Sequence, residues 1–377
     1  MIELAKKELC TGCAACASAC PNKCISMQED AEGFLFPQID HAKCISCKKC
    51  VKICPVLHEH QVKVQAAYAA VSHDDEIRMK SSSGGVFSLL AELTIRNGGV
   101  VFGAAMQEDC SIAHVAVEDL DDLPRLRGSK YVQSVIGDTY EQAKAFLQQG
   151  RQVLFSGTAC QISGLCAFLG KPYDNLICQD IICYGVPSPG VWRKYLKGKN
   201  IKSVNFRDKS TLWRTYSVTY TYADGTQKIG PSGKDPFMRG FLGKLYLRKS
   251  CENCSLKGCD ADLTLGDCWG VEQIAPELDD NRGTSVIIVR TQKGAQILEE
   301  IADRLTMQTI NYEQVRVHNP AVYRPAEPSD KRDKFYKHSD ALLERIVDKL
   351  TRPSRLVRWK GRLRAVRGHI VRLLRGK

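Results

Sequence analysis

The sequence lacks the features that mark secreted and membrane-spanning proteins. No apolar run approaches the roughly 18–20 residues that are needed to cross a bilayer. Residues 1–7 contain no apolar stretch of the kind found in secretory signals. Cysteine, in contrast, is abundant, with 18 in 377 residues. Because clustered cysteines in cytoplasmic proteins bind metal or catalyse reactions more often than they form disulfides, we expect a cytoplasmic protein with reduced thiols.

Common nucleotide-binding motifs are also missing, and so is a general excess of positive charge. No G-x-G-x-x-G follows a predicted strand and no G-x4-G-K-[ST] occurs, which excludes recognisable Rossmann and P-loop sites. The formal net charge is +12, but residues 352–377 alone hold ten Lys and Arg and no acid. The rest of the chain therefore carries only about +2, which argues against a nucleic-acid partner.

The basic C-terminal segment has a regular apolar pattern. Apolar residues recur at alternating steps of three and four, which places them on one helical face: Leu356, Trp359, Leu363, Val366, Ile370 and Leu373. A basic amphipathic helix suits an anionic membrane surface, such as the inner face of the cell membrane, or an acidic partner. A terminal helix that packs on its own protein would give the same pattern, and the sequence leaves both readings open.

Two copies of one cysteine pattern dominate the N-terminus. Both copies read C-x2-C-x2-C-x3-C-P, the first from Cys10 to Pro21 and the second from Cys44 to Pro55. This pattern is typical of two-cluster bacterial ferredoxins, in which the fourth cysteine of each run ligates the other cluster. Zinc sites use looser pairs of C-x-x-C. We therefore predict two 4Fe-4S clusters, one held by Cys10, Cys13, Cys16 and Cys54, the other by Cys44, Cys47, Cys50 and Cys20.

The sequence predicts an α+β protein, in which a small ferredoxin-like dicluster domain precedes a larger α/β domain. We place the dicluster domain at 1–60, the two parts of the larger domain at 66–200 and 201–325, and a charged, basic tail at 326–377. Apolar spacing predicts helices at 85–95, 141–147, 161–169 and 294–305. Buried strands are expected at 99–103, 153–155, 176–183, 216–222, 263–265 and 285–289, with a hairpin turn at Asp224-Gly225.

Several motifs after residue 80 carry groups suited to a cofactor. Ser83-Gly84-Gly85 opens a helix, where free N–H groups can bind an anion, although such loops often only cap helices. Cys160 begins another helix, a location that lowers a thiol pKa and favours metal binding. Together with Cys183, Cys251 and Cys254 it could supply four thiolates for a third cubane or a zinc ion. From the residues alone, four buried cysteines that only pack are an equal alternative.

These motifs occur in one order that resembles the family of coenzyme F-420 hydrogenase/dehydrogenase beta subunits, in its bacterial branch with an N-terminal dicluster ferredoxin. The resemblance covers about residues 1–310 and rests on six motifs: Ser83-Gly84-Gly85-Val86-Phe87, Gly128-Ser129-Lys130-Tyr131, Gly157-Thr158-Ala159-Cys160-Gln161, residues 180–189, Cys251-Glu252-Asn253-Cys254 and residues 263–270. It implies a central mixed sheet that binds FAD, with a 4Fe-4S cluster near the flavin.

Carried over to this sequence, the resemblance makes Cys160, Cys183, Cys251 and Cys254 the ligands of that third cluster. Cys259 departs from the family pattern and is the chief rival ligand. Cys268 is expected not to be a ligand, and Cys24, Cys110, Cys166 and Cys178 are expected to pack. The loops that would wrap FAD contain Ser82, Ser83, Gly84, Gly85, Ser129, Lys130, Tyr131, Gly157 and Thr158. Lys130 is the candidate catalytic residue, because a cation near the flavin N1/O2 edge would stabilise its anionic reduced form.

The resemblance implies an iron–sulfur flavoprotein oxidoreductase. It would pass electrons between a ferredoxin-like or other redox protein and a two-electron substrate, such as a deazaflavin or a quinone. A flavin exchanges electrons in pairs and each cubane carries one, so the flavin would convert between them. The alternative is an electron-carrier subunit of a larger redox complex, with no substrate site of its own.

Overall fold

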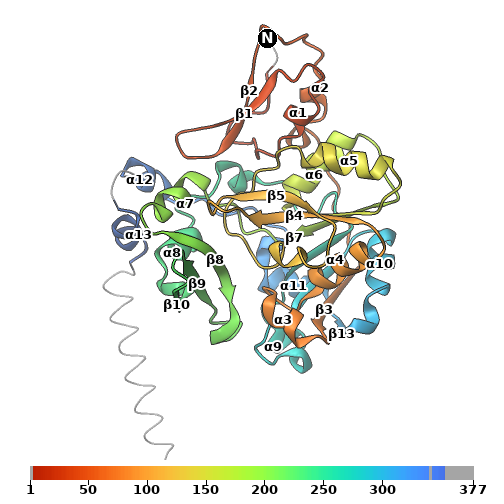
Figure 1. The fold of residues 1–377 in the computed structure, drawn as a ribbon, viewed down its shortest axis with the longest axis vertical. Helices are drawn as coiled ribbons and strands as arrows, with labels where there is room; N and C mark the ends of the chain where they lie inside the picture. Colours follow the sequence, from red (N-terminus) through yellow and green to blue (C-terminus); the bar gives the residue numbers. More distant parts are fainter. Residues whose placement is uncertain (1–2, 339–341, 353–377) are drawn as a thin grey trace, which may run out of the picture.

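The N-terminal domain stands at one end of the molecule (Figure 1). The computed structural model describes residues 3–338 and 342–352. Two antiparallel strands, β1 (Ile25–Glu29) and β2 (Leu35–Ile39), lie beside the short helices α1 (Ala15–Ser18) and α2 (Lys49–Lys52). Both helices begin after a left-handed residue that directly follows the second cysteine of its run, Ala14 at φ 62° and Lys48 at φ 59°. The repeated sequence therefore folds as a repeated structure.

One mixed sheet of eight strands forms the centre of the larger domain, and a central mixed sheet is what the family resemblance implies. Its order is β13-β3-β12-β11-β7-β6-β4-β5. The strands are β3 (Ala66–Ser72), β4 (Val100–Met106), β5 (Ile112–Val117), β6 (Val153–Gly157), β7 (Leu176–Ile181), β11 (Leu263–Asp267), β12 (Ser285–Val289) and β13 (Leu305–Thr309). Strands β4, β6, β7 and β11 run parallel, whereas the other adjacent pairs are antiparallel. Strands from both sides of residue 200 thus share one sheet.

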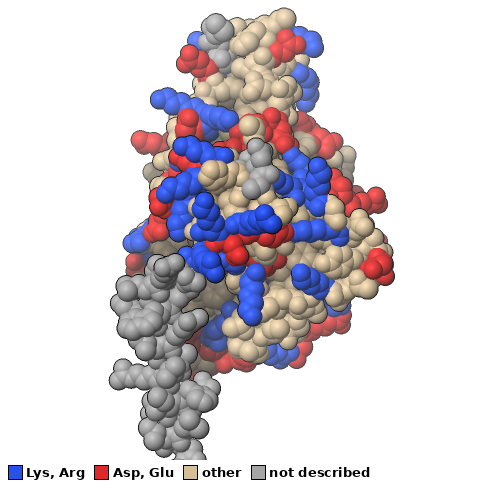
Figure 2. All heavy atoms as spheres, turned by 90° about the vertical axis from the view of Figure 1, so that its left-hand side faces the viewer, with Lys and Arg blue, Asp and Glu red and all other residues tan. Residues whose placement is uncertain are grey.

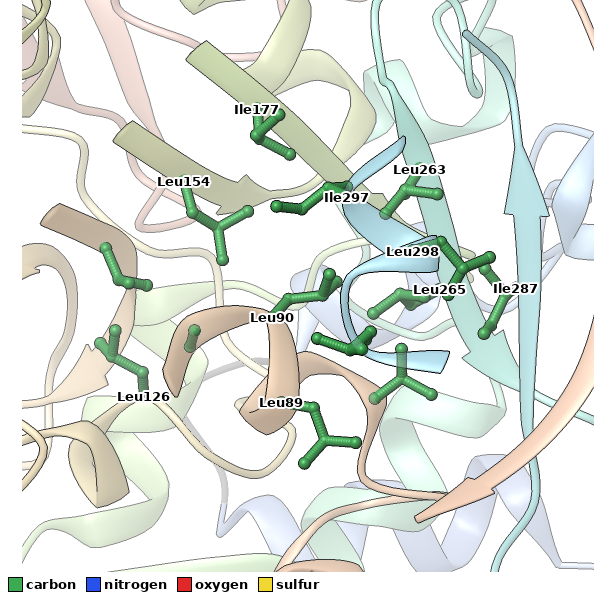
Figure 3. Close-up of a cluster of buried hydrophobic side chains, with 14 of the residues drawn as sticks. Leu89, Leu90, Leu126, Leu154, Ile177, Leu263, Leu265, Ile287, Ile297 and Leu298 are labelled. Atoms are coloured by element: carbon green, nitrogen blue, oxygen red, sulfur yellow. The ribbon is translucent and has the colours of Figure 1, made fainter. Parts of the chain in front are cut away.

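Helices cover both faces of this sheet. On one face, α4 (Val86–Arg96) and α10 (Gln292–Glu299) pack their leucines and isoleucines against the strands (Figure 3). On the other face lie α5 (Thr139–Gln148) and α6 (Ala159–Leu169), with α9 (Val271–Ile274) and α11 (Tyr312–His318) over the β3–β12 half. Because both faces are buried, β4 is apolar throughout and β6 and β7 each begin with three apolar residues, while their polar residues lie toward the carboxyl ends. Helix α3 (Asp75–Lys80) follows the carboxyl end of β3.

A second, smaller sheet lies beside the central one and has an aromatic core. It contains β8 (Ile201–Asp208), β9 (Ser217–Tyr222) and β10 (Gln227–Pro231) in the order β10-β9-β8. Trp192, Phe206, Phe237 and Tyr246 pack together there. The surrounding helices are α7 (Pro189–Leu196), α8 (Pro236–Leu242), α12 (Arg332–Lys337) and α13 (Leu343–Thr351). Lys and Arg gather on this side of the molecule, interleaved with acids that pair with several of them, as in Arg239–Asp348 (Figure 2).

Most predicted elements are confirmed to within a few residues, including the hairpin between β9 and β10 at Asp224-Gly225. The helix predicted at 294–305 is wrong at its end, because α10 stops at Glu299 and Leu305 already begins β13. No helix among the described residues is long and apolar enough to cross a membrane. The predicted amphipathic helix of the tail lies in 353–377, outside the described residues, and stays a prediction.

Candidate functional site

The eight cysteines of the two N-terminal runs line two separate cavities. Cys10, Cys13, Cys16 and Cys54 line the first cysteine cavity. The second cysteine cavity is lined by Cys20, Cys44, Cys47 and Cys50. Each cavity thus combines three cysteines of one run with the last cysteine of the other, which is the grouping expected if the two clusters exchange their fourth ligands.

A fifth thiol lies in the wall of the second cysteine cavity. Cys24, which was expected only to pack, lines this cavity, and its Sγ lies 3.3 Å from that of Cys20. The pattern C-x3-C-P-x2-C gave no reason to separate Cys24 from the other buried cysteines. The first cysteine cavity has four cysteines in its wall and no fifth among the described residues.

Four further cysteines line a third cysteine cavity in the larger domain. Cys160 is the second residue of α6, Cys183 follows β7, and Cys251 and Cys254 belong to the turn around the 3-10 segment Lys249–Asn253. Cys259 is not among the residues that line this cavity. Its Sγ instead lies 3.5 Å from the carbonyl oxygen of Ser255. The geometry therefore groups the four cysteines of the family motifs and leaves the rival outside.

Three thiols of this cavity, those of Cys160, Cys183 and Cys251, have raised pKa values. Burial raises the pKa of Cys251 to about 12, and the neighbouring Cys183 adds to the effect. The expectation of a lowered pKa for Cys160 at a helix N-terminus is wrong for the free thiol, because burial and the nearby Cys254 raise it well above its usual value. Crowded, buried thiols stay protonated until a metal displaces their protons, so binding at such a site releases protons.

A cavity of about 400 Å³ lies at the carboxyl ends of β6, β7 and β11. This is the edge at which ligands bind in open α/β sheets. Almost all residues predicted to wrap a flavin line it: Ser82, Ser83, Gly85, Ser129, Lys130, Tyr131, Gly157 and Thr158. Gly84 is the exception, since it lies against the sheet. A Cβ there would be 2.3 Å from the carbonyl oxygen of Ala70, so only glycine fits this contact.

Hydrogen bonds fix the loops around this large cavity. The backbone N–H of Ser129 donates to Ser82 Oγ at 2.8 Å, which joins the first two predicted loops. Ser83 Oγ donates to the carbonyl of Thr284 at 2.7 Å, at the start of β12. The buried amine of Lys209 donates to the Ser83 carbonyl at 2.9 Å. The loop at Ser82–Ser83 is therefore fixed to the loop at Ser129, to the start of β12 and to Lys209.

Two buried polar groups that the sequence did not single out also line the large cavity. Arg207, 3% exposed, comes from β8 and pairs with Asp267 at 2.9 Å. Burial opposes its charge, but Asp267 holds the pKa of Arg207 above its usual value. Its Nε has no hydrogen-bond partner, and neither has Oε1 of Gln179, which is 1% exposed. Such unpaired buried atoms are costly unless a ligand satisfies them.

Lys130 also lines the large cavity, with its amine turned toward backbone carbonyls. Nζ donates to the carbonyls of Arg125 and Arg127 at 2.9 and 2.8 Å, which leaves one of its three N–H donors free. Burial lowers the pKa of Lys130 to about 7. The nearby His114 is neutral near pH 7, because burial lowers its pKa to about 4.

The cavities adjoin one another in a series. Cys183 and the following residues 184–186 line both the third cysteine cavity and the large cavity. On its other side, the third cysteine cavity includes Thr11, the residue after Cys10. Helix α6 carries Cys160 in its first turn, and its Gly164 lies so close to Cys13 that a Cβ would be 2.9 Å from that side chain. A continuous path thus leads from the first cysteine cavity to the large cavity.

Comparisons with known proteins find similarity in both parts of the chain. Residues 9–57 match the 4Fe-4S dicluster domain, and residues 150–315 match the C-terminal part of the beta subunit in the coenzyme F420 hydrogenase/dehydrogenase family. One subunit of the F(420)H(2) dehydrogenase of Methanosarcina mazei is 21% identical over 327 residues, which cover 80% of this chain and 85% of that protein.

A solved structure of the F420-reducing [NiFe] hydrogenase complex from Methanosarcina barkeri contains a chain with a TM-score of 0.45 and 18% identity, covering 77% of this chain and 90% of that one. The two family matches together span the ferredoxin runs, Cys160, Cys183 and the Cys251–Cys254 pair. The protein is therefore similar to the beta subunits of the coenzyme F420 hydrogenase/dehydrogenase family over residues 150–315 and to 4Fe-4S dicluster domains over residues 9–57.

Proposed function

We propose that this protein is an iron–sulfur flavoprotein oxidoreductase that passes electrons between 4Fe-4S clusters and a two-electron substrate through FAD. The observation that carries the proposal is the shared wall between the third cysteine cavity and the large cavity, formed by Cys183 and residues 184–186. A cluster held by Cys160, Cys183, Cys251 and Cys254 would lie directly beside a cofactor in the large cavity. The same cluster would adjoin the dicluster domain through Thr11.

The residues of the large cavity fit a flavin dinucleotide. Arg207 offers an unused Nε donor, and Gln179 Oε1 offers an unused acceptor, as a ring system with both donors and acceptors requires. Lys130 lies in the same wall and adds positive charge below its pKa, which suits the phosphates of a dinucleotide, whereas Arg127 in that wall already pairs with Glu92 at 3.2 Å. A bound flavin would supply the conversion between paired and single electrons. The protein's own part is to orient the ring beside Cys183 and to hold the phosphates.

Exposed apolar side chains at the opening of the large cavity indicate the class of substrate. Ile181, Tyr184 and Leu242 line the cavity and are among the exposed large apolar side chains. Exposed apolar groups at a cavity mouth favour a flat, largely apolar ring system, which deazaflavins such as coenzyme F-420 and quinones share. The relative from Methanosarcina mazei is named for its F420H2 dehydrogenase, which supports a deazaflavin. A ferredoxin-like or other redox protein would exchange electrons at the dicluster domain.

Lys130 is proposed to stabilise negative charge on the bound cofactor, and this role predicts a pH dependence. Its pKa of about 7 means that the amine is charged below pH 7 and neutral above it. Flavin affinity of the apoprotein should therefore fall as the pH rises from 6 to 8.5, by up to about tenfold per unit above the pKa. Lys130→Met should remove this dependence, measured by flavin fluorescence titration. Lys144→Met, on α5 and outside the residues that line the large cavity, is the control. The role is wrong if Lys130→Met leaves flavin content, turnover and the pH profile unchanged.

Cofactor analysis of the full chain tests the proposed function itself. Anaerobic purification should give about twelve iron and twelve sulfide atoms per chain, as three cubanes require, and about one flavin. The reduced protein should reoxidise with a deazaflavin or quinone acceptor. Clusters without flavin or turnover would instead favour the alternative function, an electron-carrier subunit that docks on a larger redox complex.

A further inference from the structure

Arg248 connects the first and third cysteine cavities. Its backbone belongs to the third cavity, since its N–H donates to the carbonyl of Val186 at 2.9 Å and its carbonyl accepts from the N–H of Cys251 at 3.0 Å. Its side chain extends into the dicluster domain, where Nε donates to the carbonyl of Cys10 at 2.8 Å. Nη2 donates to the carbonyl of Leu35 at 3.0 Å and lies 3.9 Å from Cys10 Sγ. One residue thus contacts ligand candidates of both cavities.

The guanidinium of Arg248 is buried without an anion. Its side chain is 1% exposed, and none of the ion pairs among the described residues includes it, although Nη1 donates to the neutral Gln133 amide at 3.1 Å. It lies over the ring of Phe36, 4.1 Å from the centroid, a contact that compensates only part of the desolvation cost. By contrast, the buried Arg332 nearby pairs with Glu32. A buried cation needs negative charge close by.

A glycine makes room for this contact. Gly12, between Cys10 and Cys13, has φ +69°, and a Cβ there would lie 2.8 Å from Arg248 Nη1. A side chain at this place would push the guanidinium out of its site and would be strained in the left-handed region. Along helix α6, Cys160 and the Cys13 contact at Gly164 are separated by about 6 Å. The first and third cysteine sets therefore lie close to each other.

We propose that Arg248 is a positioning residue for electron transfer, whose charge stabilises the reduced state of both the first and the third cluster. The inference rests on the proposed third cluster, held by Cys160, Cys183, Cys251 and Cys254. A cubane with four thiolates is anionic and becomes more so on reduction, and net charge and hydrogen bonds to sulfur set its potential. Each transfer oxidises one cluster by one electron and reduces its neighbour by one. Because arginine keeps its proton throughout, the step needs no proton movement at this junction.

The location of Arg248 makes the effect selective. Arg248 contacts Cys10 of the first cysteine cavity, whereas none of its hydrogen bonds involves Cys20, Cys44, Cys47 or Cys50 of the second. The potential of the second cluster should depend much less on this charge. Arg248 would therefore raise the potentials of the two clusters nearest the flavin relative to the outer one, which favours an electron staying near the large cavity.

The test compares Arg248→Gln, Arg248→Lys and Arg332→Gln in the full chain, loaded with iron under anaerobic conditions. Reduction potentials are measured for each cluster by redox titration followed with electron paramagnetic resonance. Arg248→Gln should lower the potentials of the first and third clusters and leave the second nearly unchanged, with iron content retained. Arg248→Lys should keep the potentials of the first and third clusters close to those of the wild type, because it keeps the charge. Arg332→Gln removes another buried cation that links the dicluster domain to the body, and it should shift no potential.

Three outcomes overturn the proposal. It is wrong if no cluster potential changes in Arg248→Gln, or if the potentials of Arg248→Lys are lowered as far as those of Arg248→Gln. It is also wrong if Arg332→Gln gives the same changes in potential. If Arg248→Gln loses iron, Arg248→Lys decides: potentials near those of the wild type support the charge, and potentials lowered in the first cluster reject it. A wild-type protein with about eight irons would refute the third cluster and the proposed function. Even then, a lowered potential of the first cluster in Arg248→Gln would show that the charge of Arg248 acts on that cluster.

Discussion

Replacing Cys160 or Cys183 with serine should remove about four iron atoms of the roughly twelve expected per chain, one cubane's worth. Both cysteines line the third cysteine cavity with Cys251 and Cys254, and they come from different segments of the fold. Loss of one thiolate leaves three ligands and an exposed iron, so the cluster should not survive purification. The measurement is iron and sulfide per chain after anaerobic isolation, with the visible spectrum as a second record.

Cys259→Ser and Cys268→Ser are the matched controls for this prediction. Cys259 lies five residues after Cys254 but contacts backbone carbonyls instead of the cavity. Cys268 is buried in a separate apolar cluster of the larger domain. Both variants should keep the full iron content. The assignment fails if Cys160→Ser retains all its iron while Cys259→Ser loses a cluster.

The sequence predicted most of what depends on local spacing. The two C-x2-C-x2-C-x3-C-P runs were sufficient to group eight cysteines, and the structure places the same groups around separate cavities. Apolar runs such as Val286–Val289, within the strand predicted at 285–289, indicated buried strands, because both faces of the sheet are covered by helices. The same reasoning failed at 300–305, where apolar spacing continued from α10 into a turn and the first residue of β13.

Groups that act through distant contacts could not be predicted from the sequence. Arg207 reaches the large cavity from β8, in the second sheet, and its partner Asp267 lies 60 residues later. Arg248 reaches Cys10 across 238 residues. Cys24 was overlooked because only the folded turn brings its thiol beside Cys20. In each case the sequence shows the residue type but not the neighbour that gives it a role.

Replacing Arg207 with methionine should abolish flavin retention through purification. The variant removes a buried cation and an unused Nε donor from the cavity wall. A charge-assisted hydrogen bond contributes about 1.5–3 kcal/mol, which corresponds to a roughly 10- to 150-fold loss of affinity. The measurement is flavin per chain after gel filtration, followed by titration of the apoprotein with FAD. Asp267 also loses its partner, however, so this variant alone does not separate binding from folding.

Gln179→Leu makes that separation. Leucine removes the unpaired acceptor Oε1 of Gln179 but also the hydrogen bond that Nε2 donates to the carbonyl of Asp180. Because these two effects oppose each other, the free energy of unfolding of the apoprotein should change by less than about 1 kcal/mol. Flavin affinity should nevertheless fall by about tenfold, since a ligand donor would lose its acceptor. Gln152→Leu is the control, because Gln152 also has an unpaired buried Oε1 but does not line the cavity. Equal flavin affinity in all three proteins would mean that the large cavity does not hold the flavin ring at Gln179.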